Sequence, residues 1–292
     1  MIDLHMHSSV SDGTFRPAEL VECACDKGIT VMALTDHDTV EGVAEAQKKA
    51  NELEAQGKNI LVIPGIEISA GYENGDIHIL GYYVNTSDEV FISLLKSAWE
   101  ERCARNETRA ERFRKMGIPI KVEELKGLSG SNVITRAHFA KWLVLHKYCK
   151  TNNEAFDKYL GTGCPCYVPR TYMSRRTAVE AITAAGGIPV LAHPMLYGLN
   201  APASPKLEQL VVELKGYGLK GLETYYSSNM GNDEDVVRHL ALKHDLIMTG
   251  GSDFHGDNKP GLEMGTGRFN SLSVPYSAFK RLAEAHETGC KQ

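Results

Sequence analysis

The first side chains with metal-binding chemistry are two histidines near the amino terminus. His5 and His7 lie in the run Asp3-Leu4-His5-Met6-His7, which alternates apolar and polar residues as a strand does. Because side chains at i and i+2 of a strand point to the same face, both imidazoles can bind one ion. An isolated His-x-His can equally be a pair of structural histidines, so its interpretation depends on the rest of the chain.

Further short apolar runs are also followed by residues that bind metals. The additional candidate ligands are Asp12, His37, Glu67, His78, His193, Asp253 and His255. Most of them follow a predicted strand, while Asp12 lies in the turn after the first strand and His78 lies within one. The carboxyl ends of parallel strands meet at one rim, so these side chains are expected to converge. There are nine candidate ligands in all. One catalytic ion typically uses about three protein ligands, so nine candidates indicate two or three ions with bridging carboxylates.

Between these runs, apolar residues recur every three or four positions, as in amphipathic helices. The predicted helices are residues 17–27, 40–56, 175–185, 206–217 and 233–244. Alternating strands and helices predict a mainly parallel sheet with helices outside it, and a rim of ligands favours a barrel. Because fewer than eight strand–helix repeats can be identified, the expected fold class is α/β, a distorted (β/α)7 barrel. The strand carrying His78 is expected to depart from the simple alternation.

Residues 89–170 break this alternation. They predict an inserted helical cap that contributes substrate contacts, while residues 1–88 and 171–292 form the barrel with its metal centre. Helices are expected from residue 89 onward and near 135–146 and 153–159. Arginines 102, 105, 109 and 112 form a stripe on the first helix, but acidic residues interleave with them, so a solvated face is the simpler interpretation.

Better candidates for substrate binding occur later in the predicted cap. Thr135, Arg136 and His138 lie at a predicted helix start, where backbone amides are unpaired. The guanidinium of Arg136 matches phosphate oxygens, and the ring of His138 adds a second donor. Tyr167 and Arg170 offer a ring and a cation where the cap returns to the barrel. A purely structural role for these residues stays open at this stage.

Composition bounds the class of protein. The chain has 292 residues, of which 42% are hydrophobic and 24% are charged, as in globular enzymes with a sizeable core. The net charge of −5 gives no overall attraction to nucleic acid, so a basic surface must be local. No segment is apolar enough to span a membrane, no leader precedes the first strand, and the seven cysteines contain no Cys-x-x-Cys pair. We therefore expect a cytoplasmic protein without a membrane partner, in which Cys164 and Cys166 are a structural loop pair.

Six motifs occur in a characteristic order. They are Asp3-Leu4-His5-Met6-His7-Ser8, Ser11-Asp12-Gly13, Thr35-Asp36-His37-Asp38-Thr39, Pro64-Gly65-Ile66-Glu67, His193-Pro194 and Gly251-Ser252-Asp253-Phe254-His255. With them the chain resembles the polymerase-and-histidinol-phosphatase (PHP) family over residues 1–88 and about 175–270. The resemblance implies a distorted seven-stranded barrel with a trinuclear metal centre.

The resemblance also implies how the ligands are shared among the ions. The first ion would be held by His5, His7, Glu67 and Asp253. The second would be held by Glu67, His78 and His193, and the third by Asp12, His37 and His255. The family implies manganese, although imidazole and carboxylate ligands also suit iron and zinc.

Within the family, the inserted cap and the segment Thr35–Gly42 are similar to those of stand-alone phosphoesterases that act on nucleoside 3′,5′-bisphosphates and, in some relatives, on 5′ ends of short RNA. The implied reaction removes the 3′-phosphate to give the 5′-monophosphate, by in-line attack of a metal-bridging hydroxide. The resemblance implies that Arg136 and His138 grip a substrate phosphate. His138, or Asp38 beside the ligand His37, is the candidate general acid.

Other functions remain open from the sequence. The same centre could serve a phosphodiesterase on cyclic phosphates or RNA 5′ ends, or a histidinol-phosphate phosphatase. A non-catalytic metal-dependent binding protein is a further alternative, although it would have no need of an open multinuclear rim. The expected partner is a small phosphorylated nucleotide or a short RNA end, and no polymerase domain is expected in this chain.

Overall fold

The computed structural model describes residues 1–73, 75–129, 133–199 and 205–289 of the chain. The chain divides into two compact units. The first, the barrel unit, comprises Met1–Leu94 and Tyr172–Gln292, and the second, the helical unit, comprises Leu95–Thr171. Every strand among the described residues belongs to the barrel unit, so the strands that carry the candidate ligands form a unit of their own.

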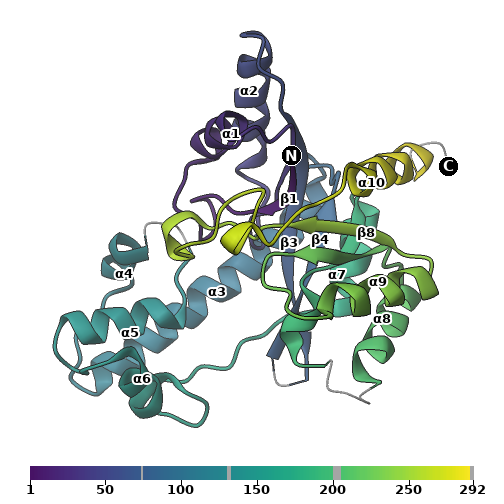
Figure 1. The fold of residues 1–292 in the computed structure, drawn as a ribbon. Coiled ribbons are helices and arrows are strands. Elements are labelled where there is room, and N and C mark those ends of the chain that lie inside the picture. Colours follow the sequence, from purple (N-terminus) through teal and green to yellow (C-terminus); the bar gives the residue numbers. More distant parts are fainter. Residues whose placement is uncertain (74, 130–132, 200–204, 290–292) are drawn as a thin grey trace. The chain divides into compact units, whose positions relative to one another are not determined.

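The barrel unit contains one sheet with the strand order β1-β2-β3-β4-β6-β7-β8, and β5 pairs with β3 beside this path. Figure 1 labels β1, β3, β4 and β8 of this sheet. The strands are β1 (Ile2–Met6), β2 (Val31–Leu34), β3 (Leu61–Tyr72), β4 (Gly75–Tyr82), β5 (Met173–Ser174), β6 (Ile188–Leu191), β7 (Gly221–Tyr226) and β8 (Ile247–Gly251). Neighbours on the path pair in parallel, except that β4 is antiparallel to both β3 and β6. Strands β2 and β6 are buried along their whole length, as apolar parallel strands covered by helices should be.

The segment after β8 closes the sheet against β1. The backbone N–H of Asp253 donates to the carbonyl oxygen of His5 at 2.8 Å, and the N–H of His7 donates to that of Phe254 at 2.9 Å. The two ends of the strand order therefore lie side by side and form a nearly closed barrel. The expected distorted α/β barrel with a seven-strand circuit is confirmed, and β4, which carries His78, is the strand that departs from parallel order.

Helices cover this sheet within the barrel unit. They are α1 (Pro17–Asp26), α2 (Val43–Glu54), α7 (Arg175–Ala184), α8 (Lys206–Tyr217), α9 (Asp233–Lys243) and α10 (Tyr276–Gly289). Helix α7 contacts β3, β4 and β6, helix α9 contacts β7 and β8, and helix α10 contacts β6 and β8. Three short 3₁₀ helices, η2 (Pro194–Tyr197), η3 (Gly256–Asn258) and η4 (Arg268–Asn270), lie in the loops, and η2 and η3 begin directly after the candidate ligands His193 and His255.

Apolar side chains from several strands fill the interior of the barrel unit. Leu4 from β1, Ala33 from β2, Ile63 from β3 and Val190 from β6 are fully buried there, and Leu282 of α10 packs against the same cluster. Burial of a large apolar side chain of this kind stabilises the fold by roughly 1.5–3 kcal/mol. This core fixes the strands whose ends carry the candidate ligands.

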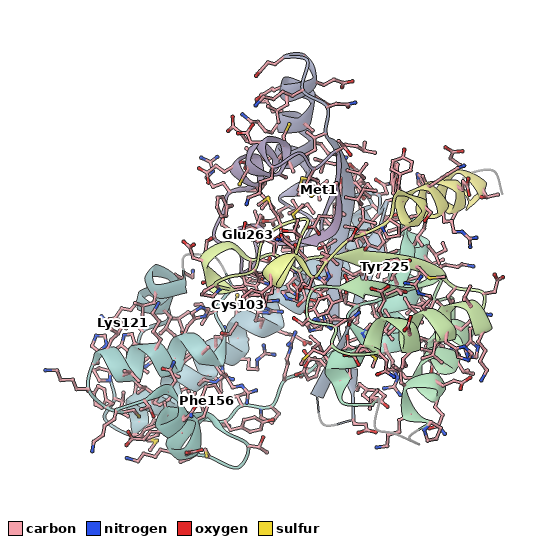
Figure 2. All side chains as sticks on the ribbon, in the orientation of Figure 1. Met1, Cys103, Lys121, Phe156, Tyr225 and Glu263 are labelled. Atoms are coloured by element: carbon pink, nitrogen blue, oxygen red, sulfur yellow. The ribbon has the colours of Figure 1, made fainter. Side chains whose placement is uncertain are left out.

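The helical unit has its own core. Its elements are α3 (Glu89–Lys115), which starts in the barrel unit, α4 (Val122–Ser129), α5 (Arg136–Leu145), α6 (Asn152–Ala155) and the π-helix η1 (Phe156–Leu160). The buried rings of Phe113 and Phe139 stack with centroids 6.0 Å apart, and the thiol of Cys166 is buried in the same cluster. Figure 2 draws the side chains of the chain, with Cys103, Lys121 and Phe156 labelled in the helical unit.

The predicted helices agree closely with those in the structure, with two differences. The helix expected over 40–56 starts only at Val43, after Gly42, and the stretch expected over 153–159 is one short α-helix followed by a π-helix. Strand β7 and helices α4 and α10 were not predicted. Among the described residues, no helix combines the length and the apolar character needed to cross a membrane.

Candidate metal centre

Glu67 of β3 is the centre of the ligand cluster. It is buried, and both of its carboxylate oxygens lie near histidine nitrogens. Oε1 lies 3.0 Å from His78 Nδ1 and 3.0 Å from His193 Nε2. Oε2 lies 3.3 Å from His5 Nε2, 3.2 Å from His7 Nε2 and 3.2 Å from His37 Nδ1. Since β3 runs in parallel with β2 on one side and antiparallel to β4 on the other, one carboxylate faces histidines from several strands.

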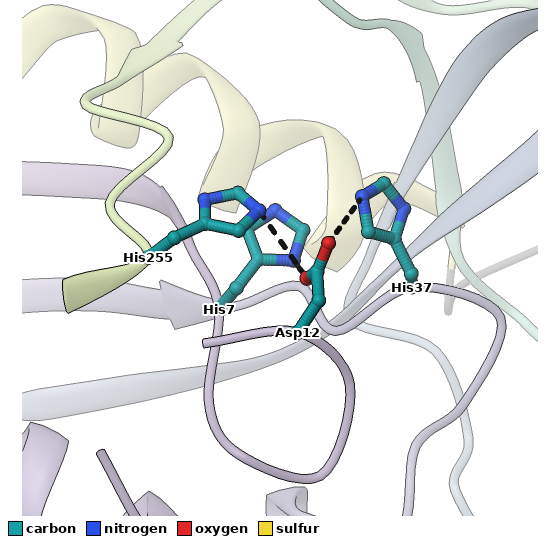
Figure 3. A group of neighbouring side chains, drawn as sticks. All are labelled: His7, Asp12, His37 and His255. Atoms are coloured by element: carbon teal, nitrogen blue, oxygen red, sulfur yellow. Dashed lines mark ion pairs between the residues drawn. The ribbon is translucent and has the colours of Figure 1, made fainter. Parts of the chain in front are cut away.

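Asp12 organises a second group beside the first. Its Oδ1 lies 3.2 Å from His255 Nε2, and its Oδ2 lies 3.8 Å from His37 Nε2. The rings of His7 and His255 stack with centroids 4.1 Å apart. Figure 3 shows the Asp12 carboxylate on its loop, reaching toward the rings of both His37 and His255. The polar turn after β1 therefore bends back over the rim as its composition predicted.

Asp253 links the two groups. Its Oδ1 lies 3.4 Å from His7 Nε2 and 3.3 Å from His255 Nδ1. Its Oδ2 accepts hydrogen bonds from the Tyr226 hydroxyl at 2.8 Å and from the Lys259 ammonium at 2.5 Å. All nine predicted ligands thus lie in one cluster at the rim of the barrel unit.

The donor atoms of this cluster fit divalent metal ions. Three groups have ligand atoms within 4.8 Å of one another, namely His7 with Asp12, His37 and His255, then His5 with His7 and Glu67, then His37 with Glu67 and His78. Two buried ring nitrogens in the cluster, Nδ1 of His7 and of His193, have no hydrogen-bond partner among the described residues. A buried polar atom without a partner is costly unless something else binds it. Mixed imidazole and carboxylate donors are those that manganese, iron and zinc accept.

The pKa values within the cluster reflect the same crowding. Burial lowers the pKa of His7, but its contacts with Asp253 and Glu67 outweigh that effect and raise the pKa to about 9. Burial also lowers the pKa of His78, but Glu67 and Asp76 outweigh that effect and raise the pKa to about 10. For His37 burial prevails and lowers the pKa to about 3. Without a metal, protons on some histidines therefore balance the buried carboxylates, and a bound ion would displace them.

Three residues at this rim have left-handed backbone conformations. Asp38, His193 and Asp253 have φ angles of 55°, 27° and 58°. Such conformations are unfavourable for residues other than glycine, and they are concentrated at functional sites. Asp38 is held by its backbone, since its N–H donates to the carbonyl oxygen of Glu67 at 2.9 Å. Its carboxylate accepts from the N–H of Ser69 at 2.9 Å, so the candidate acid lies beside β3.

The sequence did not reveal three further buried carboxylates around the cluster. Asp3 accepts from the N–H and hydroxyl groups of Ser252, and Asp36 accepts from those of Ser8. Burial raises the pKa of both carboxyl groups. The third carboxylate, Glu223 of β7, is fully buried and contacts His5 and His193. An acidic residue within an apolar strand is a signal that could have identified Asp3, whereas Asp36 follows the end of β2 and β7, which carries Glu223, was not predicted.

The predicted substrate residues lie in the helical unit. The N–H of Thr135 donates to His138 Nδ1 at 2.9 Å across the first turn of α5. The Arg136 guanidinium is exposed and lies 5.7 Å from the ring centroid of Phe156 and 5.9 Å from that of Tyr167. Arg170 is half-buried. His138 thus caps its own helix, which is the structural role that the sequence left open.

Known proteins resemble this chain along most of its length. Residues 3–161 match the PHP domain. A 5′-3′ exoribonuclease of Haemophilus influenzae is 36% identical over 87% of this chain and 89% of its own length. A 3′,5′-nucleoside bisphosphate phosphatase of Chromobacterium violaceum is 32% identical over 90% of each chain.

A solved structure agrees with these relatives. The structure, from Bifidobacterium adolescentis and provisionally described as a metal-dependent phosphoesterase, matches with a TM-score of 0.77 and 27% identity over 96% of this chain and 94% of the other. The resemblance read from the six motifs is confirmed by the family match and by relatives of this identity. This chain belongs to the PHP family and is an enzyme, a metal-dependent phosphoesterase.

Proposed function

We propose that the protein removes the 3′-phosphate from nucleoside 3′,5′-bisphosphates and leaves the 5′-monophosphate. The observation that carries this proposal is the convergence of six histidines and three carboxylates at one rim, in a chain that matches a bisphosphate phosphatase over nearly its whole length. The centre supports phosphate ester hydrolysis, and the likeness to that relative supports the substrate.

In this proposal the nine ligands hold two or three ions. One ion is held by His5, His7, Glu67 and Asp253, a second by Glu67, His78 and His193, and a third by Asp12, His37 and His255. The position of Glu67 among five histidine rings supports its role as a bridging ligand. Manganese is the proposed metal, and the donor set also suits iron or zinc.

Divalent ions at this rim would supply an acidified water and neutralise charge on the phosphoryl oxygens. The chain's own groups have other tasks. Lys259 places a cation beside Asp253, where it can balance the negative charge of an incoming phosphate. Asp38 or His138 is proposed to protonate the leaving 3′-oxygen. Because Nδ1 of His138 accepts a hydrogen bond, the neutral ring carries its proton on Nε2 and can donate a hydrogen bond to a phosphate oxygen from there. Proton transfer to the leaving oxygen requires the imidazolium form, which carries protons on both ring nitrogens.

We further propose that residues 89–170 form a cap whose Thr135, Arg136, His138 and Arg170 bind a substrate phosphate. Arg136 supports this role best, since its guanidinium has no carboxylate partner among the described residues and is exposed beside two rings. A guanidinium fork matches two phosphate oxygens, and the rings could stack on a base. A cytoplasmic location stays part of the proposal.

A second candidate is hydrolysis at the 5′ ends of RNA, which the Haemophilus influenzae relative favours. Both reactions can break the same bond, between phosphorus and the 3′-oxygen of a nucleoside that carries a 5′-phosphate. They differ in whether that phosphorus also carries the next nucleotide. An RNA substrate needs contacts along the backbone and gives salt-sensitive binding, whereas a bisphosphate needs one pocket.

The deciding experiment measures product release by the manganese-loaded protein on five substrates in parallel. They are adenosine 3′,5′-bisphosphate, adenosine 5′-monophosphate, histidinol phosphate, a cyclic phosphate diester and a short 5′-phosphorylated RNA. We expect fast phosphate release from the bisphosphate and none from the monophosphate. Turnover of RNA or the diester with an inert bisphosphate would contradict the proposed substrate and leave the metal centre intact. Chelated protein is the matched control for each substrate.

A further inference from the structure

Glu223 is a buried carboxylate that contacts two candidate ligands on different strands. Its Oε1 lies 2.8 Å from Nδ1 of His5, and its Oε2 accepts the backbone N–H of His193 at 2.8 Å. Its side chain is completely inaccessible to solvent. Strand β7 thus places one carboxylate between the segments that carry His5 and His193.

The contact with His5 has a defined chemical consequence. The other ring nitrogen of His5, Nε2, lies 3.1 Å from Nε2 of His7 and 3.3 Å from Glu67 Oε2, so this nitrogen faces the ligand cluster. A neutral imidazole carries its proton on one nitrogen and its free lone pair on the other. A carboxylate at Nδ1 selects the form with the proton on Nδ1, which leaves the lone pair of Nε2 directed at an ion.

The contact with His193 is made by the backbone. The φ angle of His193 is 27°, which is unfavourable for a residue with a side chain, and the 3₁₀ helix η2 starts at the next residue. The hydrogen bond from its N–H to Glu223 holds this conformation in place. The side chain of His193 then lies 3.0 Å from Glu67 Oε1.

We propose that Glu223 is the positioning residue of the metal centre, because it fixes the tautomer of His5 and the backbone of His193 with the two oxygens of one carboxylate. This inference rests on the proposed assignment of His5 and His193 as metal ligands. It is independent of the identity of the substrate.

The chemistry of both contacts requires a carboxylate. Both groups that face Glu223 are N–H donors, so each needs an acceptor oxygen. Glutamine of the same shape has one acceptor oxygen, and its NH₂ group would oppose the remaining donor. The neighbouring buried carboxylates differ, since the bonds of Asp3 and Asp36 go to serine hydroxyls and backbone amides rather than to a ligand ring.

The first test compares Glu223→Gln with the wild type in manganese titration calorimetry and in bound metal measured by mass spectrometry. We expect the affinity of the sites that include His5 and His193 to fall about 10- to 100-fold, the usual cost of losing an outer partner of a ligating histidine. Glu208→Gln is the matched control, because Glu208 also lies 2.8 Å from a histidine nitrogen, that of His244, which is not a candidate ligand. An affinity for Glu223→Gln within twofold of the wild type would overturn the proposal.

The second test uses the wild-type protein, so it gives a result even if Glu223→Gln fails to fold. Zinc is diamagnetic, so the ring nitrogens of the zinc-loaded protein can be assigned by ¹⁵N NMR. We expect His5 to carry its proton on Nδ1 and to bind zinc through Nε2, while Glu223→Asp, which keeps a carboxylate, retains this pattern better than Glu223→Gln. A proton on Nε2 of His5 would contradict the proposal. Neither measurement uses a substrate, so failure of the proposed phosphatase activity would leave this result standing.

Discussion

The two units of this protein differ in how they present their candidate functional residues. In the barrel unit, His5, His7 and Glu67 are buried and contact partners from several strands far apart in sequence. In the helical unit, Thr135 and Arg136 are exposed, and Thr135 and His138 are hydrogen-bonded to each other across one helical turn. The buried side chains of the cluster are held by one another, whereas Thr135 and Arg136 lie at the surface. Site geometry is therefore stronger support for metal binding than for the choice of substrate.

The largest effect is expected from Glu67→Gln. Its carboxylate faces five histidine nitrogens, so the neutral amide removes the charge shared by the whole cluster and places an NH₂ group against ring nitrogens. We expect loss of bound metal and a fall in kcat of more than about 100-fold, beyond the usual cost of changing an outer partner. Metal analysis and phosphate release on the same sample measure both.

The exposed Glu263, which pairs with Lys27, offers a matched control for this change. Glu263→Gln should leave metal content and turnover within twofold of the wild type. If Glu67→Gln behaved in the same way, the bridging role of Glu67 would be wrong.

A smaller, substrate-dependent effect is expected from Arg136→Met. One charge-assisted hydrogen bond to phosphate contributes roughly 1.5–3 kcal/mol, so KM for the bisphosphate should rise about 10- to 100-fold with metal content unchanged. Arg176→Met is the matched control, since Arg176 also lies over a ring, that of Tyr217, with 4.5 Å to its centroid. Equal KM values for the two variants would remove Arg136 from the substrate site.

The metal-free protein should lose stability as pH rises above neutrality. In the folded chain the pKa of His7 is raised to about 9 and that of His78 to about 10, both above the ordinary value of 6.5. A histidine whose pKa is raised in the folded state contributes its full stabilisation below pH 6.5. This stabilisation is lost as the pH rises through the pKa of the folded state. His37, with its pKa lowered to about 3, is neutral throughout this range. Thermal unfolding from pH 6.5 to 10 should therefore show a falling Tm for chelated protein, and a flat profile would contradict this.

The smallest effect is expected from His138→Ala. Loss of the contact at the start of α5 should lower the free energy of unfolding by about 0.5–1 kcal/mol. His138→Gln keeps an acceptor for the N–H of Thr135 but has no acidic ring, so it should recover the stability. If His138 is the general acid, neither variant recovers turnover of the bisphosphate, while both act nearly normally on an activated aryl phosphate, whose leaving group needs no proton. Normal turnover by His138→Gln on both substrates would leave the residue with its capping role only.

The sequence predicted much of the barrel because its signals are local. Helix α8 has the bounds expected from its apolar periodicity, and His5 and His7 share a face because they are two residues apart in a strand. Strand β7 was missed because Glu223 interrupts its apolar run, and an acidic residue ordinarily indicates solvent. Only its partners on β1 and after β6 explain why that position is buried.

The sequence by itself determined the residue types, their order and the strand ends at which they occur, since these depend on neighbours along the chain. Tertiary structure alone decided which ligand faces which. Antiparallel pairing of β4 brings His78 to Glu67, and the bend of the first loop brings Asp12 to His255. It also decided that Asp3, Asp36 and Glu223 lie behind the ligands. Distances between strands far apart in sequence depend on how the whole core packs, and no local pattern encodes them.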